Sequence, residues 1–141
     1  MSDDPLDMLN LLVTEAIFRA EGLARAGSKD TASAYAEVSR YEDALAALHP
    51  ANDVEGAVAR TGAVTAALRA GQYERARDLA TRYTADPALS DGRRAEIAEA
   101  FASLAQPAVP DRLRRLRDDP ALAARRRQLG TGKHALFDRA A

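Results

Sequence analysis

The chain has 141 residues, of which 47% are hydrophobic and 29% charged, with a formal net charge of -1. This composition is typical of one globular domain and excludes a fully disordered chain, which is poorer in apolar residues and carries more net charge. The sequence contains no cysteine, which excludes disulfides, thiolate metal ligands and a cysteine nucleophile. Aromatic residues are only 5%, and alanine supplies much of the apolar content, so helices are favoured over a β-sandwich.

The sequence offers no signal for a membrane. No run approaches the roughly 18 consecutive apolar residues that a spanning helix requires. The acidic start, Met1 to Pro5, lacks the positive region that opens a secretory signal peptide. We therefore expect a cytoplasmic protein that does not bind membranes.

Capping signals predict a first helix from Asp4 to about Gly27. Asp4 suits the N-cap and Pro5 the first helical position, whereas Gly27 accepts the left-handed conformation that ends a helix. Apolar residues recur at steps of three and four and therefore share one face. These residues are Leu6, Leu9, Val13, Ile17, Ala20 and Ala24.

A second helix is predicted from about Asp30 to Leu48. His49-Pro50 ends it, because the residue before proline is pushed out of helical geometry. Asn52 and Glu55 then have the spacing of a capping box, which predicts the start of a third helix. The apolar stripe of the second helix is expected at Tyr35, Val38, Tyr41 or Glu42, Leu45 and Leu48.

Three further helices follow within residues 54–104. The third is expected to end at Gly71, with its stripe at Val54, Val58, Thr61, Val64 and Leu68. The fourth runs from Tyr73 to near Asp86-Pro87, and the fifth begins at Ser90-Asp91. Beyond Pro107 and Pro110 we expect a short amphipathic piece with Leu113 and Leu116, then a last helix from Asp119-Pro120 to about Leu129.

The segment from about Glu55 to Pro87 resembles a tetratricopeptide repeat, a helical hairpin with a Gly-x-Tyr turn and small residues between its helices. The resemblance is carried by Ala66, Leu68, Gly71, Tyr73, Ala76, Ala80 and Pro87. Tyr41-Glu42-Asp43-Ala44 echoes Tyr73-Glu74-Arg75-Ala76 at an offset of 32 residues, close to the family's period of about 34. A plain helical bundle is the alternative.

The resemblance implies a binding scaffold, because stacked hairpins of this family form a concave surface that receives a peptide or protein. The first helix of each pair would line that groove. The implied partner-binding residues are Thr61, Thr65, Arg69, Arg93 and Ile97. Core or solvated positions are the alternative for each of them.

The sequence gives little support for catalysis. Its two histidines, His49 and His134, are far apart and lack a second ligand at metal-binding helical spacing. Gly130-Thr131-Gly132-Lys133 lacks the earlier glycine, the Ser or Thr and the preceding strand of a phosphate-binding loop. We expect no enzymatic activity, no catalytic residues, no metal and no cofactor.

Charge divides the chain unevenly. Residues 1–110 hold 17 acidic and 11 basic residues, a net charge of -6, whereas residues 111–141 hold 4 and 9, a net charge of +5. A basic segment can bind nucleic acid, an acidic protein or the acidic body of its own chain. The basic patch comprises Arg112, Arg114, Arg115, Arg117, Arg125, Arg126, Arg127 and Lys133.

These features predict an all-α protein of about six helices, with antiparallel hairpins stacked as a tetratricopeptide-like array or as a compact bundle. We expect one domain over residues 1–141, with an acidic helical array to residue 110 and a basic segment after it. The predicted function is a protein–protein interaction adaptor. The alternative is a nucleic-acid-binding protein that uses the basic patch. Pairing of two copies through the first helix or through Leu113 and Leu116 is a further expectation.

Overall fold

The computed structural model describes residues 4–105, and this part of the chain is all-helical, as predicted. The chain divides into two units, Met1–Gln106 and Pro107–Ala141, and the described helices belong to the first. The expected amphipathic piece at Leu113 and Leu116 and the last helix lie outside the described residues. The five described helices are α1 (Pro5–Arg25), α2 (Thr31–Ala46), α3 (Val54–Arg69), α4 (Tyr73–Thr84) and α5 (Asp91–Leu104).

Most predicted helix ends are confirmed by their local geometry. The Asp4 carboxylate accepts a hydrogen bond from the Leu6 N–H at 3.0 Å, and the Ser90 hydroxyl accepts one from the Arg93 N–H at 3.2 Å. Gly27 and Gly71 follow α1 and α3 with φ of 64° and 76°, the left-handed conformation that glycine adopts without steric cost.

The expected capping box before α3 is wrong. The residue at the N-cap is Asp53, and its side chain makes no capping hydrogen bond. The Glu55 carboxylate instead lies 3.4 Å from Nε2 of His49, beyond the end of α2. The acid that the local pattern assigned to a backbone N–H therefore lies beside the ring of His49, six residues earlier in the chain.

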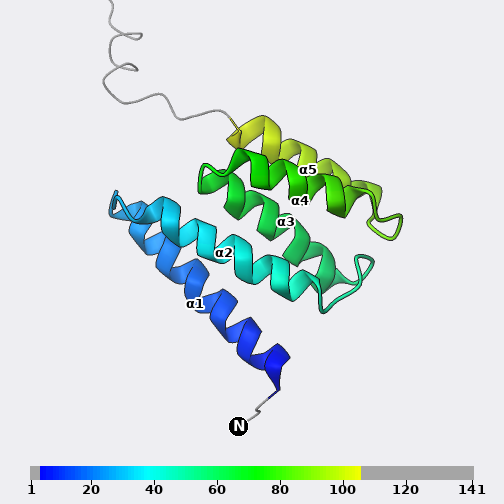
Figure 1. Cartoon of the computed structure of the whole chain (residues 1–141), viewed down its shortest axis with the longest axis horizontal. Coiled ribbons are helices and arrows are strands. Elements are labelled where there is room, and N and C mark those ends of the chain that lie inside the picture. Colours follow the sequence, from blue (N-terminus) through cyan, green and yellow to red (C-terminus); the bar gives the residue numbers. More distant parts are fainter. Residues whose placement is uncertain (1–3, 106–141) are drawn as a thin grey trace, which may run out of the picture. The chain divides into compact units, whose positions relative to one another are not determined.

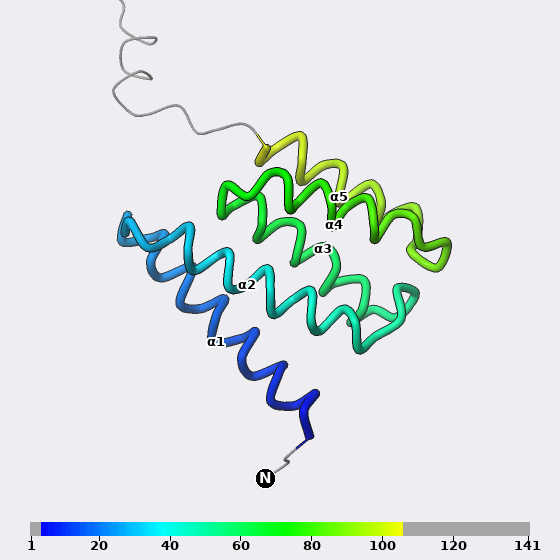
Figure 2. The backbone as a smooth tube through the Cα atoms, viewed as in Figure 1, coloured from blue at the N-terminus to red at the C-terminus, as the bar shows by residue number. Residues whose placement is uncertain are grey.

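The helices pack in a chain of neighbours in which α3 is central. α1 packs on α2, α2 on α3, and α3 on both α4 and α5 (Figure 1). Figure 2 shows the same succession, with α3 between α2 and α4. None of the described helices is both long enough and apolar enough to cross a membrane.

The central position of α3 explains why its predicted stripe is partly wrong. Half of its sixteen residues are buried, most of them alanine, because it meets other helices on several sides. Val54 and Val58 are instead 68% and 50% exposed. The four-residue spacing of the valines suggested a core face, but the close crossings of α3 require small side chains.

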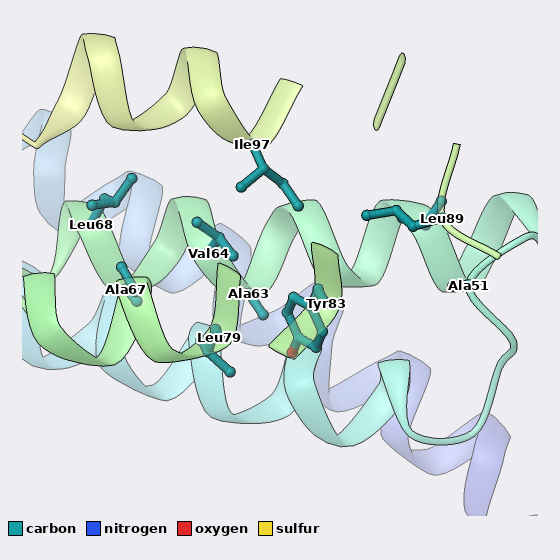
Figure 3. Packing of buried hydrophobic residues seen from close by; sticks show 11 residues of the cluster. Ala51, Ala63, Val64, Ala67, Leu68, Leu79, Tyr83, Leu89 and Ile97 are labelled. Carbon is teal, nitrogen blue, oxygen red and sulfur yellow. The ribbon is translucent and has the colours of Figure 1, made fainter. Parts of the chain in front are cut away.

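The core has two parts of different character. Between α3, α4 and α5 it contains large side chains, including Leu68, Leu79, Tyr83, Leu89 and Ile97 (Figure 3). Between α1, α2 and α3 it is built mainly from alanine, together with a few larger residues. The buried members there are Val13, Ala16, Ala20, Ala34, Val38, Leu45, Ala46, Ala59 and Ala66.

Candidate functional site

The outer face of α1 exposes large apolar side chains. Met8, Leu11, Leu12 and Phe18 are 60%, 58%, 40% and 68% exposed. They lie apart from the predicted stripe of α1, whose residues pack toward α2 and α3 in most cases. The helix is therefore apolar on two faces, and only one of them is buried within the described residues.

The exposed residues form a regular seam along the helix. Met8, Leu11, Glu15, Phe18 and Gly22 follow one another at steps of three, four, three and four, so they share one face. Leu12 widens the seam beside Leu11. We call these six residues the outer seam of α1.

The charges around the outer seam are mostly negative. Asp7, Glu15 and Glu21 are exposed, and none of them has an ion-pair partner among residues 4–105. Arg19, by contrast, forms an exposed ion pair with Glu37 of α2 at 3.7 Å. Carboxylates that have no partner in this part of the chain, beside apolar side chains, describe a surface that is complementary to a basic one.

The sequence prediction missed this surface. One apolar stripe is enough to explain how α1 packs, so the periodicity of that stripe does not show that a second apolar face exists. The signal was present in the sequence, because Met8, Leu11, Leu12 and Phe18 lie outside that stripe in a helix that Asp4 and Gly27 already delimit.

A polar cluster links α2 to α4. The Asp43 carboxylate accepts a hydrogen bond from the Tyr83 hydroxyl and lies 3.4 Å from Nη1 of Arg82 and 4.0 Å from Nη2 of Arg75. Nε of Arg75 also donates to the Ser39 hydroxyl at 3.2 Å, and Ser39 donates to the Ala63 carbonyl at 2.8 Å. The cluster thereby joins helices α2, α3 and α4 through side chains.

A cavity of about 160 Å³ lies beside this cluster, lined by Asp43, Ala46, Ala47, Arg60, Arg82, Tyr83 and Asp86. Burial and the hydrogen bond to Asp43 raise the pKa of Tyr83 above its usual range, so the phenol stays a neutral donor. Nη1 of Arg60 donates to the carbonyls of His49 and Gly56, both at 3.0 Å. Tyr83 and Arg60 thus both have partners within the fold.

Glu42 is a buried acid at the crossing of α2 and α3. It is 7% exposed, and the absence of a side chain at Gly62 makes room for its carboxyl group. A Cβ at Gly62 would lie 2.8 Å from Oε1 of Glu42. Burial raises the pKa of Glu42 from 4.5 to about 7, so the carboxyl group is partly protonated near neutral pH.

The chemistry of His49, Asp53 and Glu55 could hold a divalent cation. The expectation that neither histidine has a second ligand at metal-binding spacing is therefore wrong for His49, because Asp53 follows it by four residues. Nδ1 of His49 lies 3.2 Å from an Asp53 oxygen, and Nε2 lies 3.4 Å from a Glu55 oxygen. The two acids also stand at the N-terminus of α3, where the helix dipole favours negative charge. The three side chains lie at the junction between α2 and α3, where their contacts are ion pairs only when His49 is protonated.

The five predicted groove residues lie on α3 and α5, and one of them is buried in the core. Ile97 is 3% exposed and belongs to the α3–α4–α5 core, so its assignment to the groove is corrected. Arg69 lies over the ring of Tyr35, 5.8 Å from its centroid. The remaining residues have local partners or are half-buried: Thr61 donates to the Ala57 carbonyl, Arg93 pairs with Glu96, and Thr65 is half-buried.

The predicted basic patch, Arg112 to Lys133, lies outside the described residues, as do His134 and the Gly130–Lys133 segment. The nucleic-acid hypothesis therefore stays a prediction from sequence. No protein-family model, curated protein or solved structure matches this chain.

Proposed function

We propose that this chain is a non-catalytic protein-binding scaffold and that the outer seam of α1 is the surface that binds. The observation that carries the proposal is the position of the exposed apolar residues. Of the seven large hydrophobic side chains that are exposed in the described residues, four belong to the outer seam. A contiguous exposed apolar surface marks an interaction site more often than scattered residues do.

The outer seam has enough apolar surface to matter energetically. Full burial of one large apolar side chain stabilises by about 1.5–3 kcal/mol, and these four residues are 40–68% exposed. Covering them recovers about half of that, or roughly 3–6 kcal/mol in total. After the entropic cost of association, this supports weak binding unless polar contacts add to it.

The packing of α3 supports a proposed tetratricopeptide-like arrangement, which implies the same function. α3 and α4 form a hairpin through Gly71, with Ala66, Ala76 and Leu79 buried. α3 packs on α4 and also on α5, as the first helix of a repeat packs on its own second helix and on the next repeat. We propose that the helices are such an array, with Thr61, Thr65, Arg69 and Arg93 available to a second contact.

In-cell photo-cross-linking tests the proposed function. A photoreactive residue replaces Leu11 in one version of the full chain and Arg77, an exposed residue of α4, in another. We expect position 11 to form covalent adducts with one or a few proteins, and position 77 to form none of these adducts. Adding Phe18→Ser to the version with the photoreactive residue at position 11 should abolish its adducts. Identical adducts from both positions, or none from position 11, would contradict the proposal.

A further inference from the structure

The spacing of the outer seam defines the shape of the partner. Alternating steps of three and four residues create the seam along which two helices pack side chain against side chain. An extended peptide binds best where a sheet edge offers unpaired backbone groups, whereas the backbone of α1 is hydrogen-bonded within the helix. The shape therefore fits an amphipathic helix laid along α1.

Gly22 also favours a helix as the partner of the outer seam. A glycine inside a helix costs about 1 kcal/mol relative to alanine. No described atom lies within 4 Å of the position that a Cβ would occupy at Gly22, so internal packing does not require a glycine there. At the end of the outer seam, the missing side chain lets the backbone of a second helix come close.

The charges define the chemistry of the partner. Glu15 stands inside the outer seam and Asp7 and Glu21 stand beside it, without ion-pair partners in the described part of the chain. Among the basic residues of α1, Arg19 is paired with Glu37, which leaves Arg25. In an antiparallel second copy, Asp7 would meet Arg25, but Glu15, at the middle of the outer seam, would meet its own counterpart and repel it. A basic helix would pair with all three carboxylates.

We propose that the outer seam of α1 binds a basic amphipathic helix of a partner protein. The apolar residues of that helix cover Met8, Leu11 and Phe18, and its Lys or Arg side chains face Glu15 and the flanking acids. This inference rests on the proposed function, because it names the class of partner for the same surface.

Two fluorescein-labelled helical peptides of 21 residues test the proposal by anisotropy titration with the full chain. Both carry the same leucine seam, with steps of three and four residues, but one has Lys and Arg on its flanks and the other has Glu. At low salt we expect the basic peptide to bind at least tenfold more tightly than the acidic one, and its affinity to fall as salt is added.

Two triple variants separate the outer seam from general attraction to an acidic protein. Asp7→Asn/Glu15→Gln/Glu21→Gln neutralises the seam, whereas Glu74→Gln/Asp78→Asn/Glu99→Gln removes the same charge from α4 and α5. We expect only the first to reduce the preference for the basic peptide, to about threefold or less. Leu11→Ser/Phe18→Ser should abolish binding of both peptides, and circular dichroism shows that each variant remains helical.

Three outcomes overturn the proposal. Equal affinity for the two peptides would exclude a basic partner. An equal loss of preference for the basic peptide in the two triple variants would show that the attraction is not specific to α1. Sedimentation that finds a dimer of the full chain, made monomeric by Phe18→Ser, assigns the outer seam to a second copy. If the cross-linked adduct at position 11 still forms, any of these results overturns only the inference about the partner, and the proposed function stands. If no adduct forms at position 11, both the proposed function and this inference are contradicted.

Discussion

The helices α1 and α3 show two different uses of apolar residues. α3 is central and buried on several sides, yet its buried residues are mostly alanine. α1 buries Val13, Ala16 and Ala20 on one face and exposes its larger side chains on the other. Close helix crossings in the interior select small residues, so the large side chains left outside mark where a further surface can pack.

The largest difference in stability between the core and the outer seam is expected from a pair of leucine truncations. Leu79 is 1% exposed in the α3–α4–α5 core, whereas Leu11 is 58% exposed in the outer seam. We expect Leu79→Ala to lower the free energy of unfolding by about 3 kcal/mol, through lost burial and a cavity, and Leu11→Ala to lower it by less than about 0.5 kcal/mol. Urea unfolding followed by circular dichroism measures both. A large loss from Leu11→Ala would mean that the outer seam is part of the core.

A pair of glycine substitutions tests the same contrast at the backbone. A Cβ at Gly56 in α3 would lie 2.1 Å from the Pro50 carbonyl oxygen, and backbone cannot easily move away. We expect Gly56→Ala to destabilise by about 2–3 kcal/mol. Gly22→Ala in α1 meets nothing within 4 Å and should stabilise by about 0.5–1 kcal/mol. If α3 is closely packed at Gly56 and α1 has free space at Gly22, thermal unfolding will show a lower Tm for Gly56→Ala and a higher Tm for Gly22→Ala.

The buried carboxyl group of Glu42 makes the α2–α3 crossing sensitive to pH. Its pKa is about 7 in the fold against 4.5 ordinarily, so the folded state holds the proton more tightly than the unfolded chain. The contribution of Glu42 to stability is therefore fully present below about pH 4.5 and is lost as pH rises through 7, by roughly 2–3 kcal/mol in all.

Glu42→Gln should remove this decline, because an amide does not ionise. We expect the variant to be more stable than the natural chain at pH 8 by about 2 kcal/mol, and to differ little at pH 4.5. Urea unfolding at the two pH values measures the difference between the two proteins, which cancels the titration of other groups. Parallel stability curves for both proteins across this range would show that Glu42 is not the group responsible.

Local chemistry allowed much of the fold to be predicted. Asp4, Gly27, Gly71 and Ser90 act within a few residues of their own positions, so the ends of α1 and α3 and the start of α5 follow from the chain itself. The stripe of α1 that faces α2 was found in the same way, through helical periodicity. The helical class and the absence of strands in the described residues have the same local origin.

The contacts between helices could not be predicted from the sequence. Val54 and Val58 were expected in the core, and Ile97 at a binding groove, because spacing shows which residues share a face but not what that face meets. Glu55, expected in a capping box, lies beside the ring of His49 instead. The outer seam was readable as leftover apolar residues, yet its exposure depends on α1 packing chiefly on one neighbour. Local sequence signals thus set where most of the helices begin and end, because caps and turns act within a few residues, whereas long-range packing sets which helix faces stay exposed.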